Sequence, residues 1–297
     1  MSRAVVTQSS LAAHVQRLGE RHPPIRLDSV DRTIHSPHRV RQAYGHVIDY
    51  LARVELEVDR NVLELLTLLP GVHDTDRTFF TDVWQPQEIH HGLILDRLQQ
   101  DLGIPAAAPD TTTITPKIRL LGALSHLRPI HEVIRFLYYL TGAATEKSAV
   151  LAYNRLSAGM SALGESAIAS TIVGPIKRQE PGHFAYYQMS ALSMVQHGAL
   201  SPWQLRLAGI LRRRSFGVVG ANSQSQRADF GGVMVSLGLD DDVNSYARDI
   251  SVVESQLLWD QHHGMRVPSY VLAALREALD LHGERSPSAV PLLAQPA

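Results

Sequence analysis

Apolar residues recur at the spacing of an amphipathic helix along most of the chain, and the alternation typical of strands is not sustained. Glycine and proline separate the segments, as at Pro70-Gly71 and at Gly103, and Pro86 predicts a kink inside the second one. The pattern predicts an all-α protein with helices over residues 39–69, 74–102, 117–127, 130–160, 165–197, 202–215, 224–237, 240–263 and 268–283.

These segments divide the chain into four parts. Residues 1–38 contain three prolines and are expected to form a loosely structured N-terminal arm. Residues 39–198 are expected to form a four-helix bundle, with a linker rich in Pro, Ala and Thr at residues 104–116. Residues 199–285 are expected to add helices packed on the bundle. Residues 286–297 are rich in Pro, Ser and Ala and predict a flexible tail.

Two short stretches suggest a chemistry: Glu88-Ile-His-His91 and Glu180-Pro-Gly-His183. In each, a carboxylate stands three residues before an imidazole, and residues i and i+3 share one face of a helix. Each stretch can therefore offer an oxygen and a nitrogen to one metal ion.

A glutamate on the preceding helical segment leads each motif at a matched distance. Glu55 lies 33 residues before Glu88, and Glu146 lies 34 residues before Glu180. Each half of the bundle would then be a helical hairpin with one Glu on its first helix and Glu-x-x-His on its second. Two such hairpins supply the ligand set of ferritin-like di-iron carboxylate bundles. The predicted metal ligands are Glu55, Glu88, His91, Glu146, Glu180 and His183.

The first ligand has a competitor two residues away. Glu55 lies within an apolar stripe, where a carboxylate is costly unless a cation pairs with it. Glu57 lies on a row with Arg53 and Arg60, which is typical of a solvated face with ion pairs. We therefore favour Glu55 over Glu57 and keep both as candidates.

Other interpretations compete with a metal site. A single Glu-x-x-His is common by chance, and Glu146 in isolation is typical of a surface residue. Pro181 and Gly182 oppose a regular helix at the second motif, although distorted helices gather at functional sites. Asp260-x-x-His263 has the same spacing, near a predicted helix end where the helix dipole alone favours histidine. A helical binding or scaffold protein without metal is the alternative from a different class.

Composition narrows the possible functions. The net charge of -1 argues against a nucleic-acid binder that relies on bulk positive charge. Because cysteine is absent, disulfides and thiolate sites are excluded. Carboxylate and imidazole ligands favour iron or manganese, although imidazole also suits zinc. The sequence shows neither a signal-peptide pattern nor an apolar run of about 18 residues, so no membrane span is expected and a cytoplasmic location is the default.

A small basic cluster, Arg206 with Arg212–Arg214, lies on a predicted amphipathic helix. One interpretation is a solvated face or a helix end, and the other is a docking site for an acidic partner. The chain contains no nucleotide-binding glycine loop, no G-x-S-x-G elbow and no H-E-x-x-H motif.

The surroundings of the motifs resemble those of soluble acyl-ACP desaturases over residues 45–195. The stretch from Trp84 to Gly92 is similar to their W-x-x-E-E-x-R-H-G helix, and Thr145-Glu-Lys147 to their Q-E-R segment. Ser170-Thr-Ile172 followed by the second motif is similar to their G-T-I-A-A-D-E-x-R-H helix. The resemblance implies a homodimer with two iron ions, manganese or a mixed pair being alternatives. It assigns the ligand positions to Glu88, His91, Glu146, Glu180 and His183, with Glu55 or Glu57 completing the set.

The sequence departs from that pattern around the ligands. The acidic residue expected before each motif glutamate is Gln87 or Gln179, and the arginine expected before each motif histidine is His90 or Gly182. A threonine expected after the third ligand is Ala149. Because such groups orient and tune ligands, these changes predict a different oxidation, a different substrate or a site that has been lost.

By this resemblance the protein is expected to be an O₂-dependent di-iron oxidase with no catalytic residue beyond the ligands. It would desaturate or hydroxylate an acyl chain on an acyl carrier protein, with electrons from a reductase or ferredoxin-type donor. Such carriers are acidic, which would give the basic cluster a purpose. A di-iron N-oxygenase acting on an amine or small metabolite is the alternative. Related amine oxygenases, however, have an additional histidine at the place of Ile176.

Overall fold

The computed structural model describes residues 5–69, 71–114, 116–259 and 266–285. Within these ranges the chain is helical and contains no strand, which confirms the predicted all-α class. The predicted flexible tail and the competing motif Asp260-x-x-His263 lie outside the described residues. Among the described helices, none combines the length and the apolar character needed to cross a bilayer.

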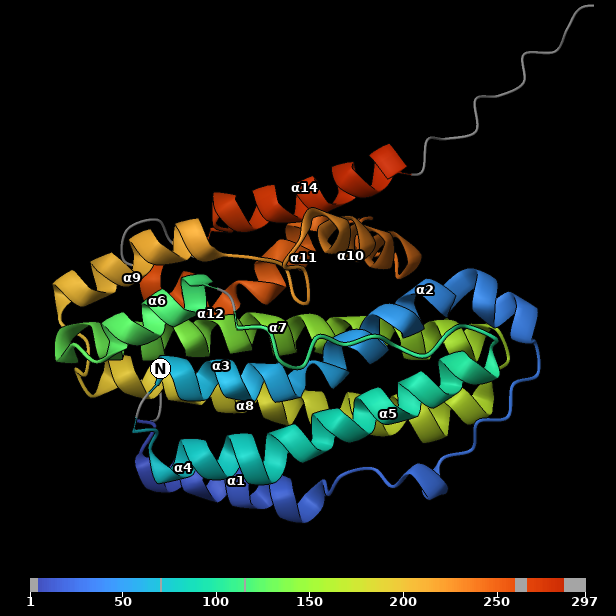
Figure 1. Cartoon of the computed structure of the whole chain (residues 1–297), viewed down its shortest axis with the longest axis horizontal. Coiled ribbons are helices and arrows are strands. Elements are labelled where there is room, and N and C mark those ends of the chain that lie inside the picture. Colours follow the sequence, from blue (N-terminus) through green and yellow to red (C-terminus); the bar gives the residue numbers. More distant parts are fainter. Residues whose placement is uncertain (1–4, 70, 115, 260–265, 286–297) are drawn as a thin grey trace, which may run out of the picture.

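Four long helices form a bundle (Figure 1). They are α2 (Pro37–Leu56), α5 (Gln85–Asp101), α7 (Arg128–Ala162) and α8 (Gly174–Gln196). α2 packs along α5, and α7 packs along α8. The helix predicted over residues 39–69 is interrupted at Glu57, after which α3 (Val58–Leu68) begins. The linker runs back along the bundle from α5 to α6 (Pro116–Ser125).

Two apolar clusters fill the interior and leave a polar layer between them. The first cluster holds Ile48, Leu95, Leu156 and Ile172, one from each chain segment of the bundle. The second holds Val58, Trp84, Phe136 and Tyr187. Along every one of the four segments, the predicted ligands fall between a residue of the first cluster and a residue of the second. The apolar pattern of the sequence thus places the ligands at one depth.

Each motif helix follows directly on a π-helical segment. α4 (Asp74–Arg77) and η2 (Thr78–Trp84) lead into α5, and η3 (Ile168–Val173) leads into α8. Pro86 and Pro175 stand just inside the α-helices that follow, where proline has no N–H to continue the α-helical pattern. The irregularity predicted at Pro86 is therefore a π segment upstream of the motif. α8 itself runs through Pro181.

The N-terminal arm is more ordered than expected. α1 (Gln8–Arg21) buries Leu11, Val15 and Leu18 and packs on α8 and η2. These three residues recur at helical spacing and form one apolar stripe, which explains why α1 packs on the bundle. The expectation of a loosely structured arm was wrong for this stretch. After a short 3₁₀ turn, η1 (Leu27–Ser29), the chain enters α2.

The C-terminal helices lie on the side of the bundle opposite α1 (Figure 1). They are α9 (Pro202–Ser215), α10 (Gln224–Ser236), α11 (Val243–Ile250), α12 (Val252–Glu254), the π segment η4 (Ser255–Trp259) and α14 (Ser269–Arg285). Within its described part, up to Trp259, the single helix predicted over residues 240–263 is thus broken into α11, α12 and η4. α10 packs on α2 and α11 packs on α7, so this layer borders the ligand helices.

Candidate metal centre

The six predicted ligands converge in the polar layer, and all six are buried. Glu55 comes from α2 and Glu146 from α7. α5 supplies Glu88 with His91, and α8 supplies Glu180 with His183. Four neighbouring helices therefore contribute carboxylates and imidazoles to one small volume, as the spacing of the sequence predicts.

These residues form two overlapping sets, each able to hold one metal ion. One set contains Glu55, Glu88, His91 and Glu180, and the other contains Glu88, Glu146, Glu180 and His183. Within each set the ligand atoms lie within 4.8 Å of one another. Glu88 and Glu180 belong to both sets, so each can give one oxygen to either ion. Each set contains these two shared carboxylates together with one further Glu and one His, so its residues would fit one metal ion.

The ring nitrogens of the two histidines have different partners. His91 Nδ1 faces the carboxylates, 3.2 Å from Glu180 Oε1. His183 Nδ1 lies 2.9 Å from Glu88 Oε1. The Nε2 atoms point away from the cluster, His91 Nε2 to Gln179 Oε1 at 2.5 Å and His183 Nε2 to Gln87 Oε1 at 2.5 Å. An Nε2–H donated to an amide oxygen leaves Nδ1 with a free lone pair, as a metal ligand requires.

Two aromatic residues donate hydrogen bonds to Glu146 and Glu55, the two carboxylates that each belong to only one of the two sets. Trp84 donates its Nε1–H to Glu146 Oε1 at 3.1 Å, and the Tyr153 hydroxyl donates to Glu55 Oε1. Sequence reasoning missed both roles. For Tyr153 the sequence did carry a signal, because this residue stands seven residues after Glu146 on α7 and therefore lies on the same helix face, toward the cluster.

Burial and mutual charge perturb the pKa values of the glutamates and histidines in the cluster. Burial raises the pKa of Glu146 to about 8 and, together with the negative charge of Glu88, raises the pKa of Glu55 well above its usual value. Burial alone would lower the pKa of the two histidines, but the surrounding carboxylates raise it well above the usual value. Burial also opposes ionisation of Glu88, yet hydrogen bonding with Glu55 and the charge of His183 lower its pKa well below the usual value. Two divalent ions would balance the four carboxylates.

Glu57 belongs to a different network. Its oxygens pair with Arg53 Nη1 at 2.9 Å and with Arg60 Nη2 at 2.7 Å. The predicted ion pairs are present, but the predicted solvated face is wrong, since Glu57 is 2% exposed and Arg60 is buried with it. The metal-ligand sets contain Glu55 and omit Glu57.

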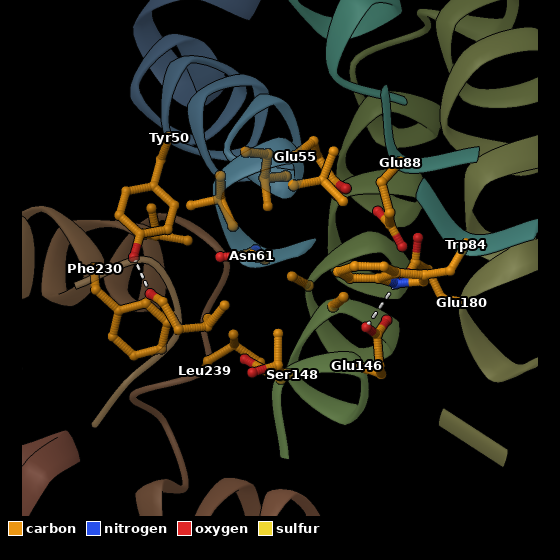
Figure 2. Close-up of a pocket in the computed structure, with 18 of the residues that line it drawn as sticks. Tyr50, Glu55, Asn61, Trp84, Glu88, Glu146, Ser148, Glu180, Phe230 and Leu239 are labelled. Atoms are coloured by element: carbon orange, nitrogen blue, oxygen red, sulfur yellow. Dashed lines mark hydrogen bonds between the residues drawn. The ribbon is translucent and has the colours of Figure 1, made fainter. Parts of the chain in front are cut away.

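A cavity of about 70 Å³ adjoins the cluster on the side of the C-terminal helices. Glu55, Glu88, Glu146 and Glu180 line one end, and the carboxylates lie together beside Trp84 in Figure 2. The opposite end is formed by Tyr50, Phe230 and Leu239. Most of the remaining lining is apolar, with Asn61, Thr145 and Ser148 as polar exceptions. A small, largely apolar group could therefore lie directly against the ligands.

The basic cluster is not a continuous patch. Arg212 is 2% exposed and donates from Nε to Glu254 Oε2 at 2.5 Å. The guanidinium of Arg213 lies over the Trp259 ring, 4.4 Å from its centroid. Arg206 is exposed. Only part of the predicted cluster could thus meet a partner, because Arg212 is held in a buried ion pair.

Neither a comparison with protein-family models nor one with curated proteins finds a match to this chain. The functional interpretation therefore depends on the geometry of the site and on the resemblance of its motifs.

Proposed function

We propose that this protein is an O₂-dependent dinuclear metal oxidase, with two iron ions as the cofactor and manganese or a mixed pair as alternatives. The observation that carries the proposal is the pair of overlapping ligand sets that share Glu88 and Glu180. When bound, two iron ions would supply oxidation of an unactivated C–H bond by O₂. A ferritin-like fold is part of the same proposal.

The chain's own residues would prepare the site for that chemistry. The four carboxylates would neutralise the charge of the ions, and Glu88 and Glu180 would contribute to both positions. Gln87 and Gln179 would keep each imidazole in the tautomer that presents Nδ1. The apolar clusters on both sides would exclude water, which strengthens every electrostatic interaction inside the site.

The cavity supports an apolar substrate group next to the ligands. By the resemblance, this group would be part of an acyl chain presented by an acyl carrier protein, with electrons from a ferredoxin-type donor. Exposed Arg206 is a candidate contact for an acidic carrier.

The alternatives draw less support. Ile176 is buried among apolar residues, so the N-oxygenase interpretation lacks its additional histidine. A metal-free scaffold would have to bury four carboxylates around two imidazoles with no metal ion to balance their charge, and burial of unbalanced charge is unfavourable. Pro181, which favoured the scaffold, lies inside an unbroken helix.

Elemental analysis of the protein expressed with iron tests the proposal directly. We expect two iron ions per chain. Glu88→Gln should lose both ions, because Glu88 belongs to both ligand sets. Glu165→Gln is the matched control, because Glu165 is an equally buried glutamate that binds the backbone N–H groups of His35 and Ser36 instead.

A wild-type chain that folds but retains neither iron nor manganese would rule the proposal out. If the metal is present, mass spectrometry of acyl-carrier conjugates incubated with O₂ and a ferredoxin reductase system identifies the product. A mass change of two hydrogens indicates desaturation, and a gain of one oxygen indicates hydroxylation.

A further inference from the structure

The end of α1 and the chain that follows it cross both motif helices. Here residues 14–25 are called the N-terminal strap. The Gln87 side-chain amide donates to the carbonyl oxygen of His22. The Gln179 amide donates to the carbonyl oxygens of His22 at 3.3 Å and of Pro23 at 2.9 Å. The same two glutamines accept from the metal-site histidines, so each amide links the strap to an imidazole.

Two further contacts hold the strap on the same helices. His90 Nδ1 lies 2.6 Å from the carbonyl oxygen of Ile25, and His14 Nε2 lies 2.9 Å from that of Gly182. A Cβ atom at Gly182 would lie only 2.2 Å from Leu18 Cδ2, so glycine lets α1 approach α8 closely. The strap is thus fixed at both motifs by side chains that are not themselves ligands.

These four positions coincide with departures from the desaturase-like pattern. Where that pattern expects an acid before each motif Glu, Gln87 and Gln179 reach the strap. Where it expects an arginine before each motif His, His90 and Gly182 contact the strap. A carboxylate could accept from imidazole but has no N–H to donate to a carbonyl oxygen. The glutamines therefore fit a site in which neutral amide oxygens, rather than anions, face the imidazoles, and main-chain carbonyls of the strap accept from the amide NH₂ groups.

The strap also decides which way each amide points. With its NH₂ group directed to a carbonyl oxygen, the glutamine must turn its own oxygen to histidine Nε2. An Nε2–H then donates to that oxygen and Nδ1 remains free for a cation. Without the strap, either face of the amide could meet the ring, and one of the two would favour the wrong tautomer.

We propose that the N-terminal strap is a structural part of the metal centre, and that Gln87 and Gln179 are positioning residues that transmit its docking to His183 and His91. The inference rests on the proposed metal site and adds to it. The strap orders the imidazoles for the ions from outside the four-helix bundle. Detaching the strap therefore weakens metal binding although every ligand is still present.

Anaerobic titration of the metal-free full chain with Co²⁺, followed optically, measures this link. Gln87→Glu and Gln179→Glu place a second oxygen against the strap carbonyls and should weaken Co²⁺ binding about 10- to 100-fold, as changes behind ligands typically do. Hydrogen exchange of the strap amides should become faster in the same variants. Gln224→Glu, an exposed substitution on α10, is the matched control and should change neither.

A second variant reaches the strap without touching the glutamines and decides the matter if these variants fail to fold. Gly182→Ala should push Leu18 away, speed exchange in the strap and weaken Co²⁺ binding. Adding Leu18→Ala makes room for the new methyl group and should recover part of the affinity. A general loss of helix stability would not be rescued in this way.

The outcomes separate this inference from the proposed function. Wild-type protein that binds two Co²⁺ ions, with unchanged affinity in the folded variants, overturns the inference and leaves the proposed function standing. Weakened binding without any change in strap exchange also overturns it. A wild-type chain that binds no Co²⁺ refutes the proposed function and the inference together.

Discussion

Glu55 and Glu57 are two buried carboxylates only two residues apart, and their replacement by glutamine should have opposite effects. Glu57→Gln removes the charge that faces Arg53 and Arg60. Breaking a buried ion pair costs about 3–5 kcal/mol. Because Arg53 is partly exposed, we expect the lower end, a loss of about 3 kcal/mol in the free energy of unfolding. Metal content should stay at the wild-type value, since Glu57 belongs to neither ligand set.

Glu55→Gln should act on the metal and spare the fold. Glu55 has a pKa raised well above its usual value by burial and by Glu88, so its neutral form is the one that the metal-free interior favours. Glutamine imitates that form and still accepts the hydrogen bond from Tyr153. The metal-free variant should therefore unfold at the same or a higher urea concentration than wild type. Metal affinity should fall by more than the roughly 10- to 100-fold typical of changes behind ligands.

Urea denaturation of the metal-free proteins, together with elemental analysis after reconstitution with iron, measures both effects. Loss of metal in Glu57→Gln with retention in Glu55→Gln would show that the ligand assignment is wrong. Equal stability of Glu57→Gln and wild type would instead contradict the reasoning from burial and charge.

Two further predictions concern protons and a buried arginine. Metal uptake should release protons and strengthen as the pH rises toward about 8, because Glu146, with a pKa that burial raises to about 8, must lose its proton to bind a cation. Calorimetric titration at several pH values checks this, and uptake independent of pH would contradict it. Arg212→Met should lower the free energy of unfolding by about 3 kcal/mol, because Glu254 would remain buried without its cationic partner and with only the Tyr270 hydroxyl as a hydrogen-bond donor. Arg213→Met should cost less than about 1 kcal/mol, and equal urea midpoints for the two variants would refute the difference.

The matched spacing of glutamates and Glu-x-x-His motifs predicted the ligand cluster because helical periodicity relates sequence distance to helix face. The same rule favoured Glu55, which lies within an apolar stripe. It misjudged Glu57, since a row of opposite charges has the same pattern whether water or protein covers it. Arg212 was misjudged for the same reason, because its cover comes from α12, which is distant in the sequence.

The arm and the helix irregularities mark a different limit. The stripe of Leu11, Val15 and Leu18 is present in the sequence, but nearby prolines predict an irregular chain, and only the packing of α1 on α8 and η2 shows that the helical spacing prevails. The π segments before both motifs have no residue signature of their own, and only the prolines that follow them are visible. The hydrogen bonds from Gln87 and Gln179 to main-chain carbonyls carry no sequence signal, because a carbonyl group is present at every residue.

The two halves of the site depend on each other more than a repeated motif requires. Glu88 and Glu180 each belong to both ligand sets, so neither metal position is complete with one motif alone. The glutamine beside each of these glutamates serves the histidine of the other motif: Gln87 meets His183, and Gln179 meets His91. Unfolding of one motif would therefore remove a shared glutamate from both metal positions. It would also remove the glutamine that accepts the hydrogen bond from the histidine of the other motif. For this reason the two positions should gain or lose their ions as a unit, which two independent Glu-x-x-His sites would not do.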